Sequence, residues 1–135
     1  MKKICLVLAF IFVFVNIMQF AVLASDIMPL NNNVLSTKTR FTISDTGEAI
    51  VSLNFEGYPN VTTGATISIS IEKRNFLFFW SNIIEETITV EGSDHFEELQ
   101  YQLEDSGTYK CTVEYVISGT GGADDVITYE EEQAF

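Results

Sequence analysis

Apolar and polar side chains alternate residue by residue through much of the chain after residue 25. Three clear examples are residues 49–56, 67–72 and 109–116. A period of two is typical of a half-buried β-strand, because successive side chains of a strand point to opposite faces of its sheet. These runs are rich in β-branched and aromatic residues, and no stretch after Ser25 has the apolar spacing of a helix. The pattern therefore predicts an all-β domain.

Clusters of Gly, Asn, Asp and Ser separate the alternating runs at short intervals. Each cluster can reverse the chain, since glycine accepts a positive φ and the polar side chains bond their own backbone. About seven short strands at this spacing are typical of a sandwich or a barrel. The strands are expected near residues 36–44, 47–56, 63–74, 79–90, 95–103, 107–118 and 124–132.

The first 24 residues follow another pattern. A basic start with Lys2 and Lys3 precedes a long apolar run, and small side chains at Val22 and Ala24 come just before the polar residue Ser25. This order is typical of a secretory signal, so we expect cleavage after Ala24, a flexible lead-in over 25–34, and a secreted or cell-surface domain over 35–135. The alternative is an uncleaved membrane anchor, because residues 4–24 are about long enough to span a bilayer. After cleavage we expect no membrane span.

Removal of the signal changes the size and charge of the chain. It leaves 135 − 24, or 111, residues, which is a common size for one domain. Those residues hold 5 basic and 19 acidic side chains, a net charge of 5 − 19, or −14. Such a surface repels nucleic acid and anionic lipid, so nucleic acid is excluded as a partner. The acidic residues are scattered among apolar ones, which favours a solvated surface.

Residues 105–111, with the sequence DSGTYKC, resemble the D-x-G-x-Y-x-C motif of immunoglobulin domains. The resemblance implies an immunoglobulin-like β-sandwich of about seven antiparallel strands. It also implies that Tyr109 is the corner tyrosine, bonded to backbone just upstream, and that Cys111 is the cysteine of strand F. The chain departs from the family because residues 49–55 contain no partner cysteine, and Trp80 follows the strand that usually carries the core tryptophan.

We therefore expect no disulfide. An odd cysteine in an exported protein can pair between chains. The strand alternation places Cys111 on the same face as Tyr109 and Val113, which favours a buried thiol that acts as a small hydrophobic side chain.

A looser resemblance covers nearly all of the expected mature chain. It looks like small secreted proteins of unknown function from Gram-positive bacteria, and it implies a bacterial source, export and a β fold without implying an activity. The matching residues are Gly47–Glu48–Ala49, Ile67 to Lys73, Trp80 and Gly107–Thr108–Tyr109.

The segment from Phe76 to Trp80 is a run of five large apolar side chains after a strand end and turn. At a hairpin tip, such side chains can stack on sugar rings, insert between lipid headgroups or dock in a partner's pocket. The commoner origin of such a run is the start of the next strand, with alternate residues in the core. The candidate binding residues are Lys73, Arg74, Phe76, Phe78, Phe79 and Trp80.

Other chemistry is weakly indicated. Asp124 with Asp125, or Asp94 near Glu97, offers oxygen ligands for calcium, but the spacing fits no calcium-binding loop and a solvated hairpin is favoured. His95 is the only histidine, which excludes a multi-histidine metal centre, and no nucleophile motif lies near it. We expect no metal, no cofactor and no catalytic residues.

These observations favour a non-catalytic binding or adhesion module that recognises an extracellular protein or glycan. One alternative is a hydrolase that pairs Glu97 or Glu98 with Asp105 in a cleft. A structural subunit of a surface assembly is the other.

Overall fold

The structure, a computed structural model, describes residues 31–135, and Asn31–Phe135 form one compact unit. The predicted signal peptide and its cleavage after Ala24 lie outside the described residues. The seven strands are β1 (Val34–Ile43), β2 (Glu48–Gly57), β3 (Thr62–Arg74), β4 (Trp80–Glu91), β5 (Asp94–Gln102), β6 (Thr108–Gly119) and β7 (Asp125–Ala134). The predicted number of strands is confirmed, and every boundary lies within two residues of its expected place.

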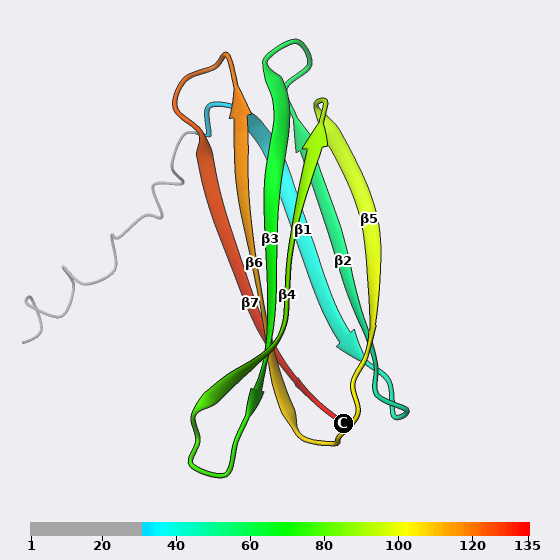
Figure 1. Cartoon of the computed structure of the whole chain (residues 1–135). Coiled ribbons are helices and arrows are strands. Elements are labelled where there is room, and N and C mark those ends of the chain that lie inside the picture. Colours follow the sequence, from blue (N-terminus) through cyan, green and yellow to red (C-terminus); the bar gives the residue numbers. More distant parts are fainter. Residues whose placement is uncertain (1–30) are drawn as a thin grey trace, which may run out of the picture. The chain divides into compact units, whose positions relative to one another are not determined.

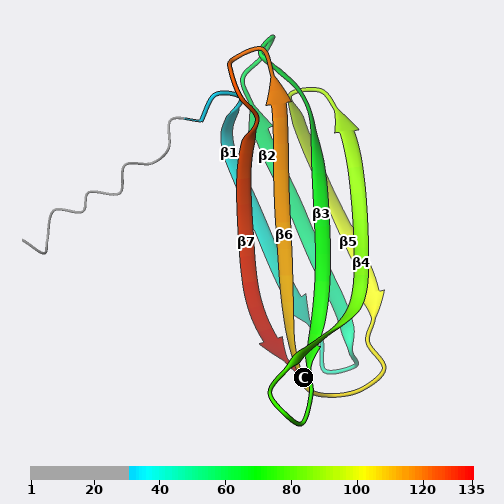
Figure 2. The same ribbon diagram turned by 60° about the vertical axis from the view of Figure 1, so that its left-hand side comes forward.

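The strands form two antiparallel sheets that pack as a sandwich. One sheet has the order β1-β2-β5 and the other has the order β4-β3-β6-β7. Figures 1 and 2 show the two layers facing each other, with β3 and β6 in the middle of the larger sheet. The predicted all-β sandwich is thus confirmed. The described residues contain no helix.

The core lies between the sheets and is built from alternate residues of the central strands. Along β3 and β6, the buried residues alternate with half-buried or exposed ones. Ile69 of β3 faces Val113 of β6 in register, and Ile71 faces Cys111. The two-residue period seen in the sequence therefore marks the inner face of each central strand. Because residues 31–135 contain both sheets and this core, the domain has what it needs to fold by itself.

Side chains also link the two sheets along both open sides of the sandwich. On one side, Thr37 Oγ1 of β1 lies 2.6 Å from Tyr129 Oη of β7, so that β1 and β7 are joined across the layers. On the other side, Tyr101 Oη of β5 donates a hydrogen bond of 2.6 Å to Glu86 Oε2 of β4. These bonds join the edge strands of the two sheets.

Residues 31–34 are the described part of the predicted lead-in, and they are held against the loop before β7. The backbone N–H groups of Asn32, Asn33 and Val34 all donate to the carboxylate of Asp125, at 2.9, 2.6 and 3.0 Å. Asn33 is fully buried, and its side chain donates to the carbonyl of Ala123 at 3.0 Å. This network anchors the start of β1.

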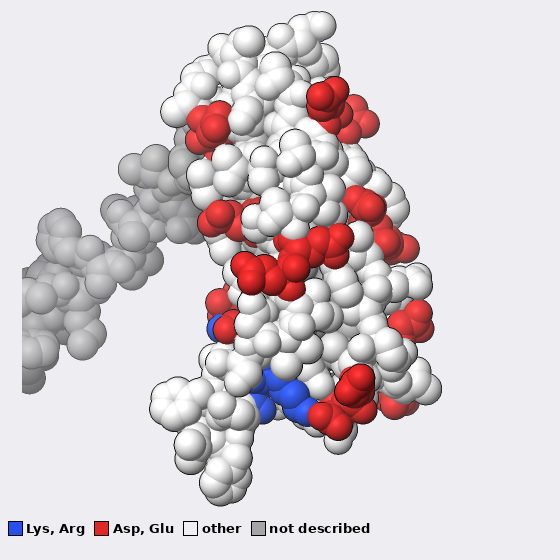
Figure 3. Space-filling view, in the orientation of Figure 1, with Lys and Arg blue, Asp and Glu red and all other residues white. Residues whose placement is uncertain are grey.

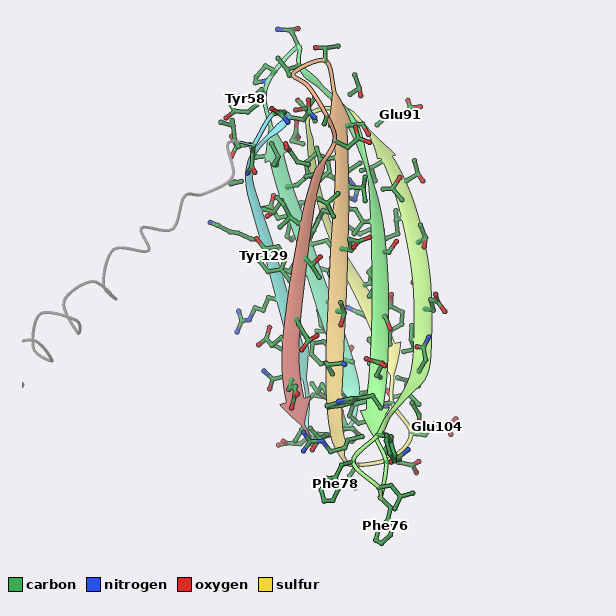
Figure 4. All side chains as sticks on the ribbon, turned by 90° about the vertical axis from the view of Figure 1, so that its left-hand side faces the viewer. Tyr58, Phe76, Phe78, Glu91, Glu104 and Tyr129 are labelled. Atoms are coloured by element: carbon green, nitrogen blue, oxygen red, sulfur yellow. The ribbon has the colours of Figure 1, made fainter. Side chains whose placement is uncertain are left out.

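The connection between β3 and β4 lies at the opposite end of the sandwich from residues 31–34. Figure 1 shows this hairpin projecting beyond the other turns of its end, and Figure 4 shows Phe76 and Phe78 at its extremity. The antiparallel pairing of β3 with β4 runs to the last residue of the strand, where Arg74 faces Trp80. Hence the hairpin is supported by strand pairing up to its loop.

Candidate binding site at the aromatic tip

Residues 75–79, which join β3 to β4, form a tight loop organised by Asn75. Phe78 N donates to the Asn75 carbonyl at 3.0 Å, and Asn75 N donates to the Phe79 carbonyl at 2.8 Å. The side-chain oxygen of Asn75 accepts two further bonds, from Leu77 N at 3.0 Å and from Phe79 N at 3.1 Å. Four of the five backbone N–H groups of this loop are therefore bonded within it.

The apolar side chains of the loop face water. Phe76 is 93% exposed, Leu77 64%, Phe78 80% and Phe79 67%. The alternative that alternate residues of this run enter the core is therefore wrong for these four positions. Figure 4 shows Phe76 and Phe78 pointing away from the sandwich. We call the segment Phe76–Trp80 the aromatic tip.

Phe78 has a backbone conformation that disfavours its side chain. Its φ is 64°, in the left-handed region. The backbone bond between Asn75 and Phe79 leaves residues 76–78 as a three-residue hairpin loop, which commonly places glycine at its last position. A β-carbon at that position is crowded by the backbone. A bulky residue in this region is uncommon and has an energetic cost of about 1 kcal/mol. Phenylalanine at this site is thus unfavourable for the loop itself.

Trp80 lies half-buried at the base of the aromatic tip, and two cations are close to its ring. The guanidinium carbon of Arg74 is 5.0 Å from the centre of the indole ring, and Lys110 Nζ is 4.8 Å from it. Both distances fall within the range of a cation–π contact. Sequence reasoning missed Lys110, because it lies on β6 and only the pairing of β6 with β3 brings it here.

Each cation near the base also has an acidic partner. Lys73 lies 3.2 Å from the carboxylate of Asp105, Arg74 lies 3.5 Å from Glu132, and Lys110 lies 2.7 Å from Glu72. The hydrogen bond between Lys110 and Glu72 raises the pKa of Lys110. Lys73, Arg74 and Lys110 are three of the five basic residues in 31–135.

Figure 3 shows basic side chains at the base of an uncharged lobe, with acidic side chains beyond them. At this end of the domain, the number of charged side chains therefore increases from the aromatic tip toward the sandwich.

Tyr109 and Cys111 are buried residues of β6, near the end of the sandwich that carries the aromatic tip. Tyr109 Oη donates a hydrogen bond of 2.5 Å to the carbonyl of Asp105, and its ring stacks on Phe135 with centres 5.9 Å apart. Tyr109 thereby fixes the connection from β5 to β6. Cys111 is 2% exposed, and burial raises the pKa of its thiol to about 12. Cys111 is a free thiol, and residues 31–135 contain no disulfide.

The carboxylates considered for hydrolysis have separate partners. Glu97 lies 3.0 Å from Nε2 of His95, and Glu98 accepts a bond of 2.9 Å from Ser52. Asp105 instead lies beside Lys73, in a hollow of about 300 Å³ that is lined by neither glutamate. The structure does not bring the three carboxylates into one cavity there.

Asp125 and Glu97, two of the candidate calcium ligands, have other partners. Asp125 binds the backbone of residues 32–34, as described above. Within 31–135, no group of three or more His, Cys, Asp or Glu side chains is arranged to hold a metal ion. Across the same residues, no helix is long and apolar enough to cross a membrane.

No protein-family model matches the sequence, and no curated protein matches it at a significant level.

Proposed function

We propose that this protein is an exported, non-catalytic binding or adhesion module that engages its partner through the aromatic tip. One observation carries the proposal: four adjacent large apolar side chains, Phe76 to Phe79, are each 64–93% exposed on a loop supported by strand pairing. Contiguous exposed apolar side chains on a soluble domain mark interaction sites, because leaving them in water has a free-energy cost.

The remaining architecture supports a binding role of the immunoglobulin-like type. In that family, strands A, B and E lie in one sheet and C, F and G in the other. The strands β1, β2 and β5 correspond to the first set, and β3, β6 and β7 to the second. The bond from Tyr109 to Asp105 has the geometry of a tyrosine corner. Domains of this architecture commonly present loops on a rigid frame.

Export rests on the amino-terminal pattern. A basic start, an apolar run and small residues up to Ala24 are the features of a secretory signal. An extracellular place also suits a partner that is a surface protein or a glycan, the classes expected from the sequence.

The test uses residues 31–135 and a tip variant, Phe76→Ser with Phe78→Gly. Both changes remove exposed apolar side chains, so we expect the variant to fold and its melting temperature not to fall. Binding to a glycan array and capture of extracellular proteins should be lost in this variant. The matched control is Phe96→Ser, which removes another phenylalanine, 66% exposed, from β5. Where the wild type binds, equal binding by the tip variant, or loss of binding in the control alone, would contradict the proposal.

A further inference from the structure

The polarity of the surface changes in three steps along the aromatic tip. Phe76, Leu77, Phe78 and Phe79 are outermost and carry no hydrogen-bonding side-chain group. Trp80 follows at the base, in contact with the cations of Arg74 and Lys110. A phospholipid bilayer has the same order along its normal, from hydrocarbon to an interface where Trp, Lys and Arg meet the headgroup phosphates.

Most backbone N–H groups of the loop would stay bonded in an apolar medium. A backbone N–H group that enters hydrocarbon without a partner has a large free-energy cost, so a segment that enters lipid must satisfy its own groups. Four of the five N–H groups of residues 75–79 are bonded within the loop, two of them to the side-chain oxygen of Asn75. The loop can therefore leave water without losing these bonds.

Glycan and protein partners fit the tip less well. A glycan site needs polar side chains beside its aromatic rings, whereas the outermost side chains, Phe76 to Phe79, are all apolar and the Asn75 oxygen beside them is already used by backbone N–H groups. A protein partner would need a pocket that fits a convex tip of four large side chains. A fluid bilayer adapts to such a tip, and its phosphates are anionic partners of the same kind as the carboxylates that the three cations already bind.

We infer that the aromatic tip inserts into the surface of a phospholipid bilayer, with Phe76 to Phe79 among the acyl chains and Trp80, Arg74 and Lys110 at the level of the phosphates. This inference rests on the proposed function, because it keeps the aromatic tip as the binding site, and it makes a lipid bilayer the partner in place of a protein or glycan. Residues 31–135 carry 5 basic and 18 acidic side chains, a net charge of 5 − 18, or −13. Zwitterionic phosphatidylcholine should therefore bind more tightly than bilayers rich in anionic lipid.

The only tryptophan of the chain, Trp80, reports on insertion. Residues 31–135 are mixed with phosphatidylcholine vesicles, and both the emission of Trp80 and co-sedimentation are measured. We expect a blue shift of the emission and co-sedimentation with the vesicles. Phe76→Ser with Phe78→Gly should weaken partition by about a hundredfold, since two phenylalanines no longer leave water. Phe96→Ser should bind vesicles like the wild type.

Three outcomes would overturn the inference. One is the absence of both signals with phosphatidylcholine vesicles. Another is vesicle binding that is the same in the tip variant. The third is binding that needs anionic lipid and disappears with salt. If the protein does not bind vesicles but its binding to glycans or proteins still depends on the aromatic tip, the lipid inference fails alone and the proposed function stands. If binding to glycans, proteins and vesicles is independent of the tip, both fail.

Discussion

At the scale of single residues, Phe78 has a backbone conformation that phenylalanine disfavours. Its left-handed φ of 64° belongs to a loop position that glycine fills without strain, yet the chain places an exposed aromatic side chain there. The side chain has no packing role in the sandwich, because it is 80% exposed. Retaining phenylalanine at this position is consistent with a contribution to binding.

Phe78→Gly should stabilise residues 31–135 by about 1 kcal/mol, because glycine removes the backbone crowding. The measurement is urea unfolding followed by circular dichroism. The matched control is Phe76→Gly in the same loop, where φ is not positive. That change should be neutral or destabilising by about 0.5–1 kcal/mol, since glycine adds freedom to the unfolded chain. A loss of stability in both variants would show that Phe78 is not strained.

Burial of Cys111 gives a second residue-scale prediction. Its pKa in the folded domain is raised from 9.0 to about 12, so the folded state holds the thiol proton over a pH range in which the unfolded state loses it. The contribution to stability is fully present below pH 9 and is lost as the pH rises toward 12. Burial also raises the pKa of Tyr101 and Tyr115, which acts in the same direction.

The free energy of unfolding should therefore fall between about pH 9 and 12, as measured by urea titration at several pH values. Iodoacetamide at pH 8 should leave Cys111 unmodified in the native domain and modify it in urea. Rapid alkylation of the native domain would mean that the thiol is accessible.

At the scale of elements, the hairpin of β3 and β4 has one part that the residue pattern predicts and another part that only strand pairing decides. The alternating run through β3 predicts its strand, and Asn75 is a typical turn residue. The run from Phe76 to Trp80 has no alternation, so its apolar character fits a buried strand as well as an exposed loop. Pairing of Arg74 with Trp80 places the four residues from 76 to 79 in the loop, outside both sheets.

The segment before β1 is a second element whose position depends on a distant residue. Asp125, which is 8% exposed, accepts three backbone N–H bonds from residues 32–34. Hydrogen bonds to a charged group contribute about 1.5–3 kcal/mol each to stability. Asp125→Asn should therefore lower the free energy of unfolding by about 2 kcal/mol.

The measurement is again urea unfolding of residues 31–135. Asp124→Asn is the matched control, because Asp124 is adjacent in sequence and exposed, and its change should be within about 0.5 kcal/mol of the wild type. Equal effects of the two substitutions would show that charge alone, and not the bonds to residues 32–34, determines the result.

At the scale of the whole domain, the charge is strongly one-sided. With 5 basic and 18 acidic side chains in 31–135, repulsion between carboxylates opposes the compact state. Added salt screens this repulsion, since the Debye length falls from about 10 Å at 0.1 M to about 3 Å at 1 M. The ion pairs at the base of the aromatic tip oppose this trend, but they are few and partly exposed.

Raising sodium chloride from 0.05 to 0.5 M should therefore stabilise the domain, by about 1 kcal/mol in urea unfolding at pH 7. Sorbitol at matched osmolality separates screening from general exclusion of solute. A decrease in stability with salt would instead mean that the ion pairs outweigh the repulsion.

The sequence by itself determined the strand content, the seven strand positions and the inner face of each central strand. These features follow from local rules, because alternation and turn residues act over a few neighbouring positions. The predictions of export and of a binding role also come from the sequence, and they stay predictions.

Only the tertiary structure decided which distant residues meet. Lys110 reaches the ring of Trp80 from 30 positions away, and Asp125 binds the N–H of Asn32 from 93 positions away. It also decided that Phe76 to Phe79 are exposed. The physical reason is that burial and contact depend on strand pairing between distant segments, and one strand's own pattern of side chains does not specify its partners.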